Sequence, residues 1–219
     1  MRLRALLLAA GAAAGWLAIR RVGRRSGATD VEVQAPLPGD PIVAHPLWES
    51  TRAITVEAPP EEVWPWIVQM GFPAYRAGWY TPYWLDRLQW GIEERSSDTI
   101  VSELQELAVG DRVPDSRDWS AYFHVVELAP ERALVLHSTR HVLPPMRSNE
   151  FTWAFVLRPD GERATRLLIR ARGRMEPRLA RVVLGPLISL GDFANASVML
   201  RGIKARAEGH RAVPEKAAA

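Results

Sequence analysis

The sequence contains no cysteine. A chain without thiols cannot form disulfides, thiolate zinc sites or iron–sulfur clusters, and it offers neither a cysteine nucleophile nor a cysteine for lipid attachment. The cellular compartment stays open, because a cysteine-free chain suits reducing and oxidising surroundings alike. The patterns G-x-S-x-G, G-x-G-x-x-G and G-x-x-x-x-G-K-[ST] are also absent. The sequence therefore predicts no serine-hydrolase elbow and no dedicated nucleotide site.

Histidine is scarce, with five residues in the chain and no H-x-H or H-E-x-x-H spacing. His137 and His141 lie four positions apart, but in a strand that turns towards Pro144 they need not converge. We therefore predict no metal site and no cofactor. His124 and His137 are candidate general bases if they face the protein interior, since a desolvated imidazole titrates near neutrality. The alternative is that both are structural histidines.

The positive charge is concentrated at the amino terminus. The formal net charge is +3 and the isoelectric point is about 9.7, but the first 25 residues hold six arginines and no acid, so the rest of the chain carries 3 − 6 = −3. A basic globular domain is thereby excluded, and nucleic acid is not an expected partner. Residues 26–160 hold 10 basic and 20 acidic side chains, whereas residues 161–211 hold 11 and 4. This basic band indicates either an internal dipole or an anionic lipid partner.

The run ALLLAAGAAAGWLAI, residues 5–19, is uncharged and is flanked by Arg4 and Arg20. As a helix it would be about 22 Å long at about 1.5 Å per residue, short of a hydrocarbon core about 30 Å thick, although flanking arginines and Trp16 can extend its reach. We expect an uncleaved hydrophobic helix that anchors the chain in a membrane. A cleaved signal peptide and a peripheral segment are the alternatives. The arginines after the run place the domain in the cytoplasm by the positive-inside rule.

Composition divides the chain into four parts: the anchor or signal segment 1–25, a proline-rich extended linker 26–47, a folded domain 48–208 and a disordered tail 209–219. With 219 residues, one domain with appendages is expected. Within the domain, apolar periodicity predicts a strand over 52–57, helices over 61–70, 80–88 and 177–208, and further strands over 100–104, 112–113, 122–128, 133–140, 151–157 and 165–172. Gly185 and Pro186 predict a break or kink near the start of the last helix.

Successive strands joined by short turns imply an antiparallel sheet, and one long C-terminal helix is left to cover it. The expected fold is therefore α+β, with a curved antiparallel β-sheet wrapped around the long C-terminal helix. This is the helix-grip arrangement, here preceded by the N-terminal hydrophobic helix. Such a sheet and helix can enclose a cavity that opens near the short helices.

Several segments carry a family resemblance: RAITVEAPPEEVWPWIVQMG at 52–71, RAGWYTPYWLDRL at 76–88, LQELAVGDRVP at 104–114, TWAFVL at 152–157 and DFANASVMLRGIKARAE at 192–208. On these segments the chain resembles the SRPBCC or START-like superfamily, in a bacterial membrane-anchored branch. That superfamily includes polyketide cyclase/dehydrase proteins and lipid-transport domains. The first and last segments are the specific ones. The resemblance implies the helix-grip fold strongly and an activity only weakly, because this fold hosts carriers, sensors and enzymes.

Aromatic residues are concentrated in two places, residues 64–90 and the strand at 151–155. In that strand Phe151, Trp153 and Phe155 alternate and share one face. Aromatic rings with polar tips suit a pocket for an apolar ligand, although packing alone also explains them. The candidate ligand-binding residues are Trp66, Trp79, Tyr80, Tyr83, Trp84, Phe151, Trp153, Phe155, Phe193 and Met199.

Together these features predict a membrane-tethered binding domain for a hydrophobic small molecule, such as a lipid, a quinone or a polyketide-like compound. A polyketide cyclase or dehydratase is one alternative, and it would require an imidazole or carboxylate facing the cavity. A ligand-free interaction module with a filled core is the other.

Overall fold

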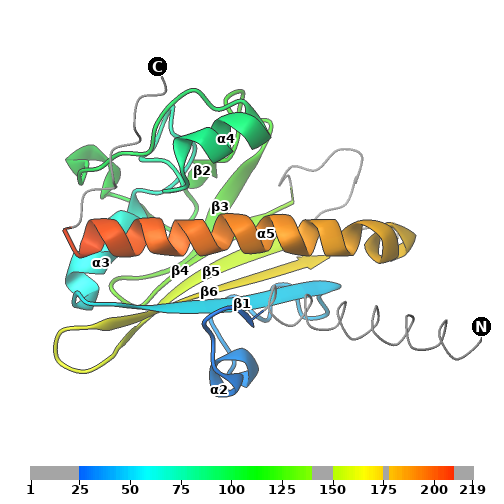
Figure 1. Ribbon diagram of the computed structural model, residues 1–219, viewed down its shortest axis with the longest axis horizontal. Helices are drawn as coiled ribbons and strands as arrows, with labels where there is room; N and C mark the ends of the chain where they lie inside the picture. The colour runs from blue at the N-terminus through cyan, green and yellow to red at the C-terminus, as the bar shows by residue number, and fades with distance from the viewer. Residues whose placement is uncertain (1–24, 140–149, 175–177, 210–219) are drawn as a thin grey trace, which may run out of the picture.

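The computed structural model describes residues 25–139, 150–174 and 178–209, with the side chains of 178–191 left aside. Figure 1 shows a curved sheet with a long helix lying across one face. The helices are α2 (Asp30–Gln34), α3 (Pro60–Val68), α4 (Tyr83–Trp90), the 3-10 turn η1 (Ser102–Leu104) and α5 (Arg178–Ala207). The strands are β1 (Trp48–Val56), β2 (Arg112–Pro114), β3 (Tyr122–Ala129), β4 (Ala133–Ser138), β5 (Glu150–Pro159) and β6 (Thr165–Arg174).

The described strands form one antiparallel sheet in the order β1-β6-β5-β4-β3-β2. Strands β2 to β6 follow one another as a meander because turn residues separate them. Glu131 and Gly161 take positive φ angles of 59° and 80° in the turns after β3 and β5. β1 then pairs with β6, from Trp48 opposite Gly173 to Val56 opposite Thr165. This pairing leaves β1 at one edge of the sheet and β2 at the other.

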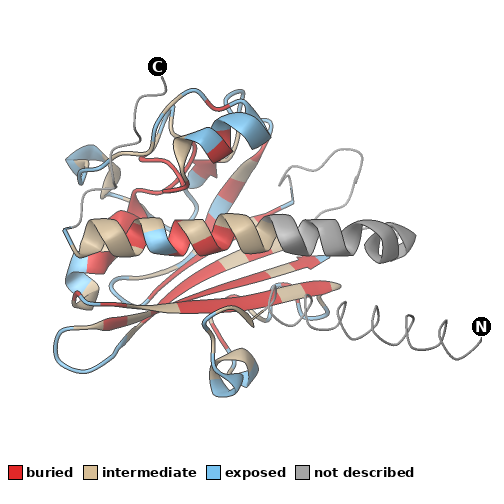
Figure 2. Ribbon diagram, in the orientation of Figure 1, coloured by how far each residue is buried: buried red, intermediate tan, exposed pale blue. Residues whose placement is uncertain are grey.

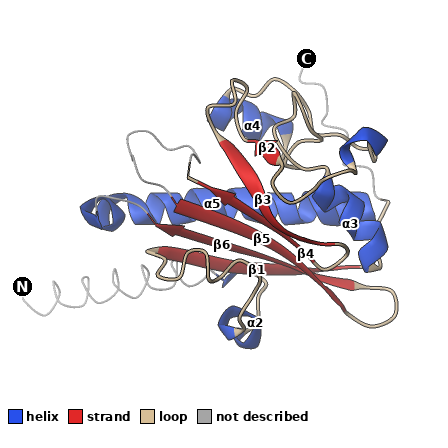
Figure 3. Cartoon of the chain, turned by 180° about the vertical axis from the view of Figure 1, so that it is seen from behind, coloured by secondary structure: helices blue, strands red, loops and turns tan. Residues whose placement is uncertain are grey.

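Helix α5 covers one face of the sheet, which we call the inner face (Figures 1 and 3). Strand alternation sends every second side chain to this face. The main core lies there, and Figure 2 shows buried residues along the strands beneath the helix. Its fully or almost fully buried members include Val56, Phe123, Leu134, Leu136, Phe155, Leu157, Leu167, Ile169, Met199 and Ile203. The predicted α+β helix-grip arrangement of sheet and C-terminal helix is confirmed.

Helix α3 follows β1 where the sequence predicts a helix. Pro60 occupies its first turn, where a missing N–H costs nothing, and Glu61 and Glu62 lie at the end of the helix that favours negative charge. Val63 and Ile67 are fully buried in the main core. The helix therefore joins β1 to the core through its apolar face.

The segment 26–47, expected to be an extended linker, packs instead against the outer face of the sheet. It contains α2, whose first turn is a capping box between Thr29 and Glu32. Leu37 and Val43 are buried, and Leu37 joins a second apolar cluster with outer-face residues of β1, β4, β5 and β6. Proline content alone did not reveal this packing, because the arginines of β6 that bind the segment lie 130 or more positions away in the sequence.

Arginines of β6 hold this segment in place. The guanidinium of Arg170, which is 3% exposed, donates to the backbone oxygens of Glu32, Val33 and Ala35, and it pairs with Asp40 at 2.7 Å. It therefore binds the unpaired carbonyls at the C-terminal end of α2. Arg166 and Arg172 also point outward: Arg166 pairs with Glu32, while Arg172 pairs with Asp40 and Glu49. These three members of the basic band are neutralised inside the protein.

Three local expectations differ from the structure. Residues 100–104 form no strand; they contain η1, a single turn closed by the bond from Leu104 N to Val101 O. The second short helix begins at Tyr83, not at Tyr80, because Tyr80 takes a left-handed φ of 57° and Pro82 is extended. The expected break at Gly185 and Pro186 is absent, because helix α5 continues through both residues.

The predicted anchor helix at 5–19 and most of the predicted tail lie outside the described residues. In the part of the chain that the structure describes, no helix combines the length and the apolar character needed to cross a membrane.

Candidate functional site

A cluster of aromatic rings lies on the inner face of the sheet, and Trp153 of β5 is at its centre. Its ring centroid lies 5.2 Å from that of Phe155, 5.4 Å from Trp79, 6.0 Å from Phe123 and 6.2 Å from Phe151. These rings come from two strands and from the loop between α3 and α4. The tilted and edge-on geometries are those that aromatic pairs favour.

Burial changes along this cluster. Phe155 and Phe123 are fully buried, and Trp79 is 8% exposed. Phe151 and Trp153, on the same face of β5, are only half-buried, as is Phe193 on α5. The inner face therefore changes from a closed core near α3 to accessible aromatic surface towards the start of β5. Accessible apolar rings that continue a buried cluster are a feature of ligand sites.

Strand β6 supplies small side chains to this accessible end. Its inner-face residues run from Ile169 through Ala171 to Gly173. Trp48 of β1 and Phe151 of β5 stack across Gly173, with ring centroids 6.1 Å apart and an interplanar angle of 17°. A Cβ at position 173 would lie 3.5 Å from the Phe151 ring and 3.6 Å from that of Trp48. Both distances are ordinary van der Waals contacts, so this stacking does not itself require glycine.

A buried polar cluster lies beside the rings, between β1 and α5. Arg52 is 1% exposed and points to the inner face, the same face as Ile54 and Val56. One of its terminal nitrogens donates to Ser50 Oγ at 2.8 Å, and the other pairs with the carboxylate of Asp192. Ser50 Oγ also donates to Asp192 Oδ2 at 3.3 Å. Because each buried charge has a partner, this cluster is tolerated in the core.

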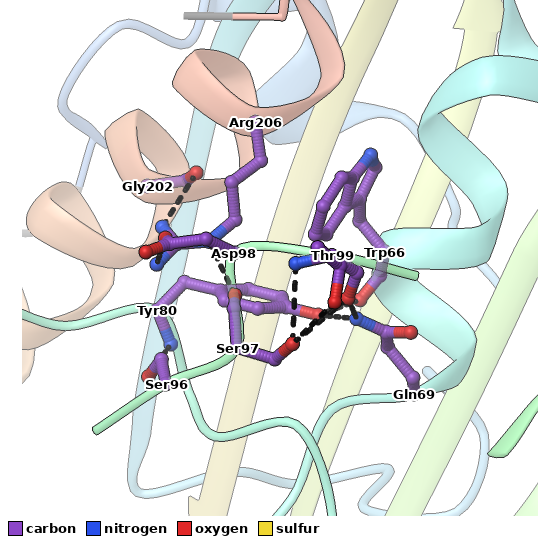
Figure 4. Close-up of polar contacts among 9 residues, drawn as sticks. All are labelled: Trp66, Gln69, Tyr80, Ser96, Ser97, Asp98, Thr99, Gly202 and Arg206. Carbon is purple, nitrogen blue, oxygen red and sulfur yellow. Dashed lines mark hydrogen bonds and ion pairs between the residues drawn. The ribbon is translucent and has the colours of Figure 1, made fainter. Parts of the chain in front are cut away.

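A second polar network fixes the loop that carries Trp79 (Figure 4). The Tyr80 hydroxyl donates to the backbone oxygen of Trp66 and accepts from Gln69 Nε2, both at 2.9 Å. Gln69 is fully buried, and its side-chain oxygen accepts from the backbone N–H of Val101 at 2.9 Å. Burial raises the pKa of the Tyr80 hydroxyl well above its usual value, so Tyr80 stays neutral at physiological pH.

Helix α5 closes this network from the other side. The guanidinium of Arg206 lies over the Tyr80 ring, 4.7 Å from its centroid. It also donates to the backbone oxygen of Ser97 at 2.8 Å and pairs with Asp98 at 2.8 Å. A Cβ on Gly202 would lie 2.1 Å from the Tyr80 backbone oxygen, so only glycine permits this approach. The contacts hold Trp79 against the sheet; nothing in their chemistry indicates catalysis.

The structure brings together most of the predicted ligand-binding residues. The inner-face core and its partly buried margin contain Trp66, Trp79, Tyr80, Phe151, Trp153, Phe155 and Met199. Phe193 is half-buried on α5. Tyr83 and Trp84 lie apart on α4: the Tyr83 ring is covered by the guanidinium of Arg95 at 4.4 Å, and Trp84 is 56% exposed. These two do not contribute rings to the cluster around Trp153.

The two candidate general bases lie on the outer face. His124 stands between Phe123 and Val125, and His137 follows Leu136; these three neighbours belong to the inner core. Alternation therefore directs both imidazoles away from α5. They stand opposite one another in the pairing of β3 with β4. The condition for their proposed catalytic role, that they face the interior, is not met.

Among the described residues, no group of three or more acidic or histidine side chains is arranged to hold a metal ion. The polar side chains of the described inner face include those of the Arg52, Ser50 and Asp192 cluster.

The sequence analysis did not single out Arg52 or Asp192, although a signal was present. Arg52 shares its strand face with Ile54 and Val56, and Asp192 lies one helical turn before Ala196 on the face that reaches Met199. A charged residue on an otherwise apolar face is a sign of a buried polar contact. Trp48 and Phe123 were missed because both lie outside the two aromatic-rich stretches, residues 64–90 and 151–155.

No family model matches this chain, and no curated protein matches it. Several solved structures are similar. TTHA0849 from Thermus thermophilus is 16% identical, with 75% of this chain and 100% of that chain covered and a TM-score of 0.43. Norcoclaurine synthase from Thalictrum flavum is 13% identical, with 69% of this chain and 86% of that chain covered and a TM-score of 0.39. CalU16 from Micromonospora echinospora is 19% identical, with 74% of this chain and 84% of that chain covered and a TM-score of 0.36. At these identities and TM-scores the likenesses do not identify a function, and the fold assignment rests on this chain's own strand order and helix packing.

Proposed function

We propose that this protein binds a hydrophobic small molecule with planar, ring-containing character between the inner face of the sheet and α5. The observation that carries the proposal is the change in burial along the aromatic cluster. Phe151 and Trp153 remain half-buried, whereas Phe155 and Phe123 beside them are closed off from solvent. An apolar ligand that covered the accessible ring surface would gain about 25 cal/mol for each Å² removed from water.

The proposal is tested with the full chain in phosphatidylcholine nanodiscs. Fluorene, a planar hydrocarbon, is titrated by equilibrium dialysis, and binding to empty nanodiscs is subtracted. We expect saturable binding that weakens at least about fivefold in Phe151→Ala, since that substitution removes one ring contact worth about 1 kcal/mol together with apolar area. Trp84→Ala is the matched control, because Trp84 is an exposed aromatic on α4.

The two variants separate the outcomes. Equal affinity losses in Phe151→Ala and Trp84→Ala would locate binding away from the inner face. Absence of saturable binding above that of empty nanodiscs would reject a ligand-binding function and favour the filled-core interaction module. Near-ultraviolet circular dichroism of each variant verifies that the aromatic core remains packed.

We also propose that residues 5–19 tether the protein to a membrane, with the folded domain in the cytoplasm. The support is the apolar run with its flanking arginines. Arg25 pairs with Asp30, and Ser26 accepts from the backbone N–H of Ala53. Six residues of chain reach at most about 20 Å, so a tether at Ile19 would hold the β1 edge of the sheet near the membrane surface. The ligand's local concentration would rise accordingly.

The absence of cysteine makes the topology easy to test. A single cysteine introduced at the exposed Ala74 is the only thiol that a maleimide can label. We expect a membrane-impermeant maleimide to label it only after cells are opened, and the protein to resist extraction by alkaline carbonate. Labelling in intact cells would reject the cytoplasmic orientation, and release by carbonate would reject the tether.

A further inference from the structure

The indole N–H of Trp153 is buried and has no hydrogen-bond partner among the described residues. An indole nitrogen can only donate, and a buried tryptophan N–H normally finds an acceptor. A buried donor without an acceptor destabilises the protein, because the donor loses its hydrogen bonds to water and gains none in return. This donor lies on the residue that contacts four other aromatic rings, at the centre of the proposed binding surface.

The neighbours of Trp153 explain why the described protein supplies no acceptor. In the strand pairing, Trp153 stands opposite Leu136 of β4 and Ala171 of β6, whose side chains carry no oxygen. The nearest rings belong to Phe155, Trp79 and the other cluster members, which offer π faces only.

Asp192 and Ser138, two polar groups further along the inner face, already have partners. Asp192 Oδ2 accepts from Ser50 and pairs with Arg52, and Ser138 Oγ donates to the backbone oxygen of Tyr122. Neither group accepts a hydrogen bond from the Trp153 indole N–H. A molecule bound against Trp153 can provide the acceptor that these groups do not.

We propose that the molecule bound on the inner face carries a hydrogen-bond acceptor oxygen, such as a ketone or quinone carbonyl, that accepts the hydrogen bond of the Trp153 indole N–H. This inference rests on the binding function proposed above and narrows it to a ligand class. A hydrocarbon would fill the aromatic surface without satisfying the donor. A planar compound with a carbonyl on its edge does both, and selectivity between the two follows from that single hydrogen bond.

The test compares fluorene with 9-fluorenone, which share a planar tricyclic skeleton and differ by a carbonyl in place of a methylene. Both are titrated by equilibrium dialysis into the full chain in phosphatidylcholine nanodiscs, with empty nanodiscs subtracted. Trp153→Phe removes the N–H and keeps an aromatic ring. One hydrogen bond corresponds to a roughly 3- to 10-fold change in affinity. We expect Trp153→Phe to weaken fluorenone binding by this factor more than it weakens fluorene binding. Trp84→Phe, on the exposed face of α4, serves as the matched control.

The affinities for fluorenone and fluorene together show whether the proposed hydrogen bond fails or whether ligand binding itself fails. If both probes bind the wild type and Trp153→Phe weakens them equally, the inner face binds ligands but the indole donates to none of them. If neither probe binds, the binding function fails and the inference fails with it.

A second measurement does not depend on a core variant being fully folded. In ¹H–¹⁵N spectra of the wild-type protein, the Trp153 indole proton should move downfield when fluorenone is added and should not do so with fluorene. Its resonance is assigned as the one that Trp153→Phe removes. A Trp153 indole resonance that responds equally to both probes would overturn the proposed hydrogen bond and favour a contact between the N–H and a neighbouring ring.

Discussion

Arg52 and Asp192 form a buried ion pair that joins the first strand of the sheet to the last helix. Arg52 is 1% exposed and the side chain of Asp192 is 17% exposed. Ser50, on the same strand face, contacts both. A buried pair gives little net stability compared with apolar residues, but removing one partner leaves the other charge unpaired in the core. The pair links α5 to β1 beside the aromatic cluster.

Removing one member of this pair should be costly. Asp192→Ala leaves Arg52 charged and buried without its carboxylate, so we expect a loss of about 3 kcal/mol in the free energy of unfolding. Urea unfolding, followed by tryptophan fluorescence, measures it. The double variant Arg52→Met with Asp192→Leu should be more stable than Asp192→Ala alone, because it leaves no unpaired charge. A double variant that is less stable would contradict this account.

The Tyr80 hydroxyl should contribute measurably to stability. Tyr80→Phe removes the group that donates to the Trp66 backbone oxygen and accepts from Gln69, and we expect a cost of about 1 to 3 kcal/mol in unfolding free energy. Tyr83→Phe is the matched control, since Tyr83 is half-buried on α4 outside this network. Equal effects of the two substitutions would show that the network is not a source of stability.

Gly202 is expected to resist substitution despite its place inside a helix. Alanine usually gains about 1 kcal/mol over glycine in a helix. Here its Cβ would lie 2.1 Å from the Tyr80 backbone oxygen, and relieving such overpacking costs about 1 to 3 kcal/mol. We therefore expect Gly202→Ala to lower the melting temperature. Arg201→Ala, one position earlier on the exposed side, should leave it almost unchanged. A higher melting temperature in Gly202→Ala would mean that α5 can move away from the loop that carries Tyr80 without loss of stability.

The segment on the outer face should loosen in acid. Hydrogen bonds from Arg166 and, to a smaller extent, from Thr29 lower the pKa of Glu32 from 4.5 to about 2, against the opposing effect of burial. Because the folded-state pKa is depressed, this stabilisation is complete above about pH 4.5 and is lost as the pH falls towards 2. The protection factors of the backbone amides of α2, which correct for the intrinsic pH dependence of exchange, should fall over this window in the wild type. Glu32→Gln should exchange faster than the wild type at neutral pH, with less change on acidification. If the wild type and Glu32→Gln showed the same dependence of exchange on pH, Glu32 would not be the group that stabilises this segment.

Neither histidine of the central strands should affect ligand uptake. His124 and His137 point to the outer face, away from the aromatic cluster. We expect His124→Ala and His137→Ala to change the affinity for fluorene less than about twofold, since surface substitutions away from a site usually cost under about 0.5 kcal/mol. Dialysis with the same nanodisc preparation measures this. A tenfold loss of fluorene affinity in either variant would show that the imidazole contributes to ligand binding.

Sequence patterns predicted helices and strands well where residues adjacent in the sequence determine the secondary structure. Pro60 with its following acids located α3, and turn residues separated the strands from β3 to β6. Prediction failed where distant partners decide the outcome. Residues 26–47 have the composition of a linker, and their packing depends on Arg166 and Arg170 of β6. Tyr80 is a further case, because its left-handed backbone is held by contacts with Trp66, Gln69 and α5.

The sequence by itself determined which side chains share a face. Alternation groups Phe151, Trp153 and Phe155 on one side of β5, and Arg52 with Ile54 on one side of β1. Only the tertiary structure decided which side is inner, since that choice depends on where α5 packs and on how the register aligns separate strands. The strand register and the packing of α5 also bring aromatic residues from separate segments into one cluster around Trp153. They leave the two histidines on the opposite face of the sheet.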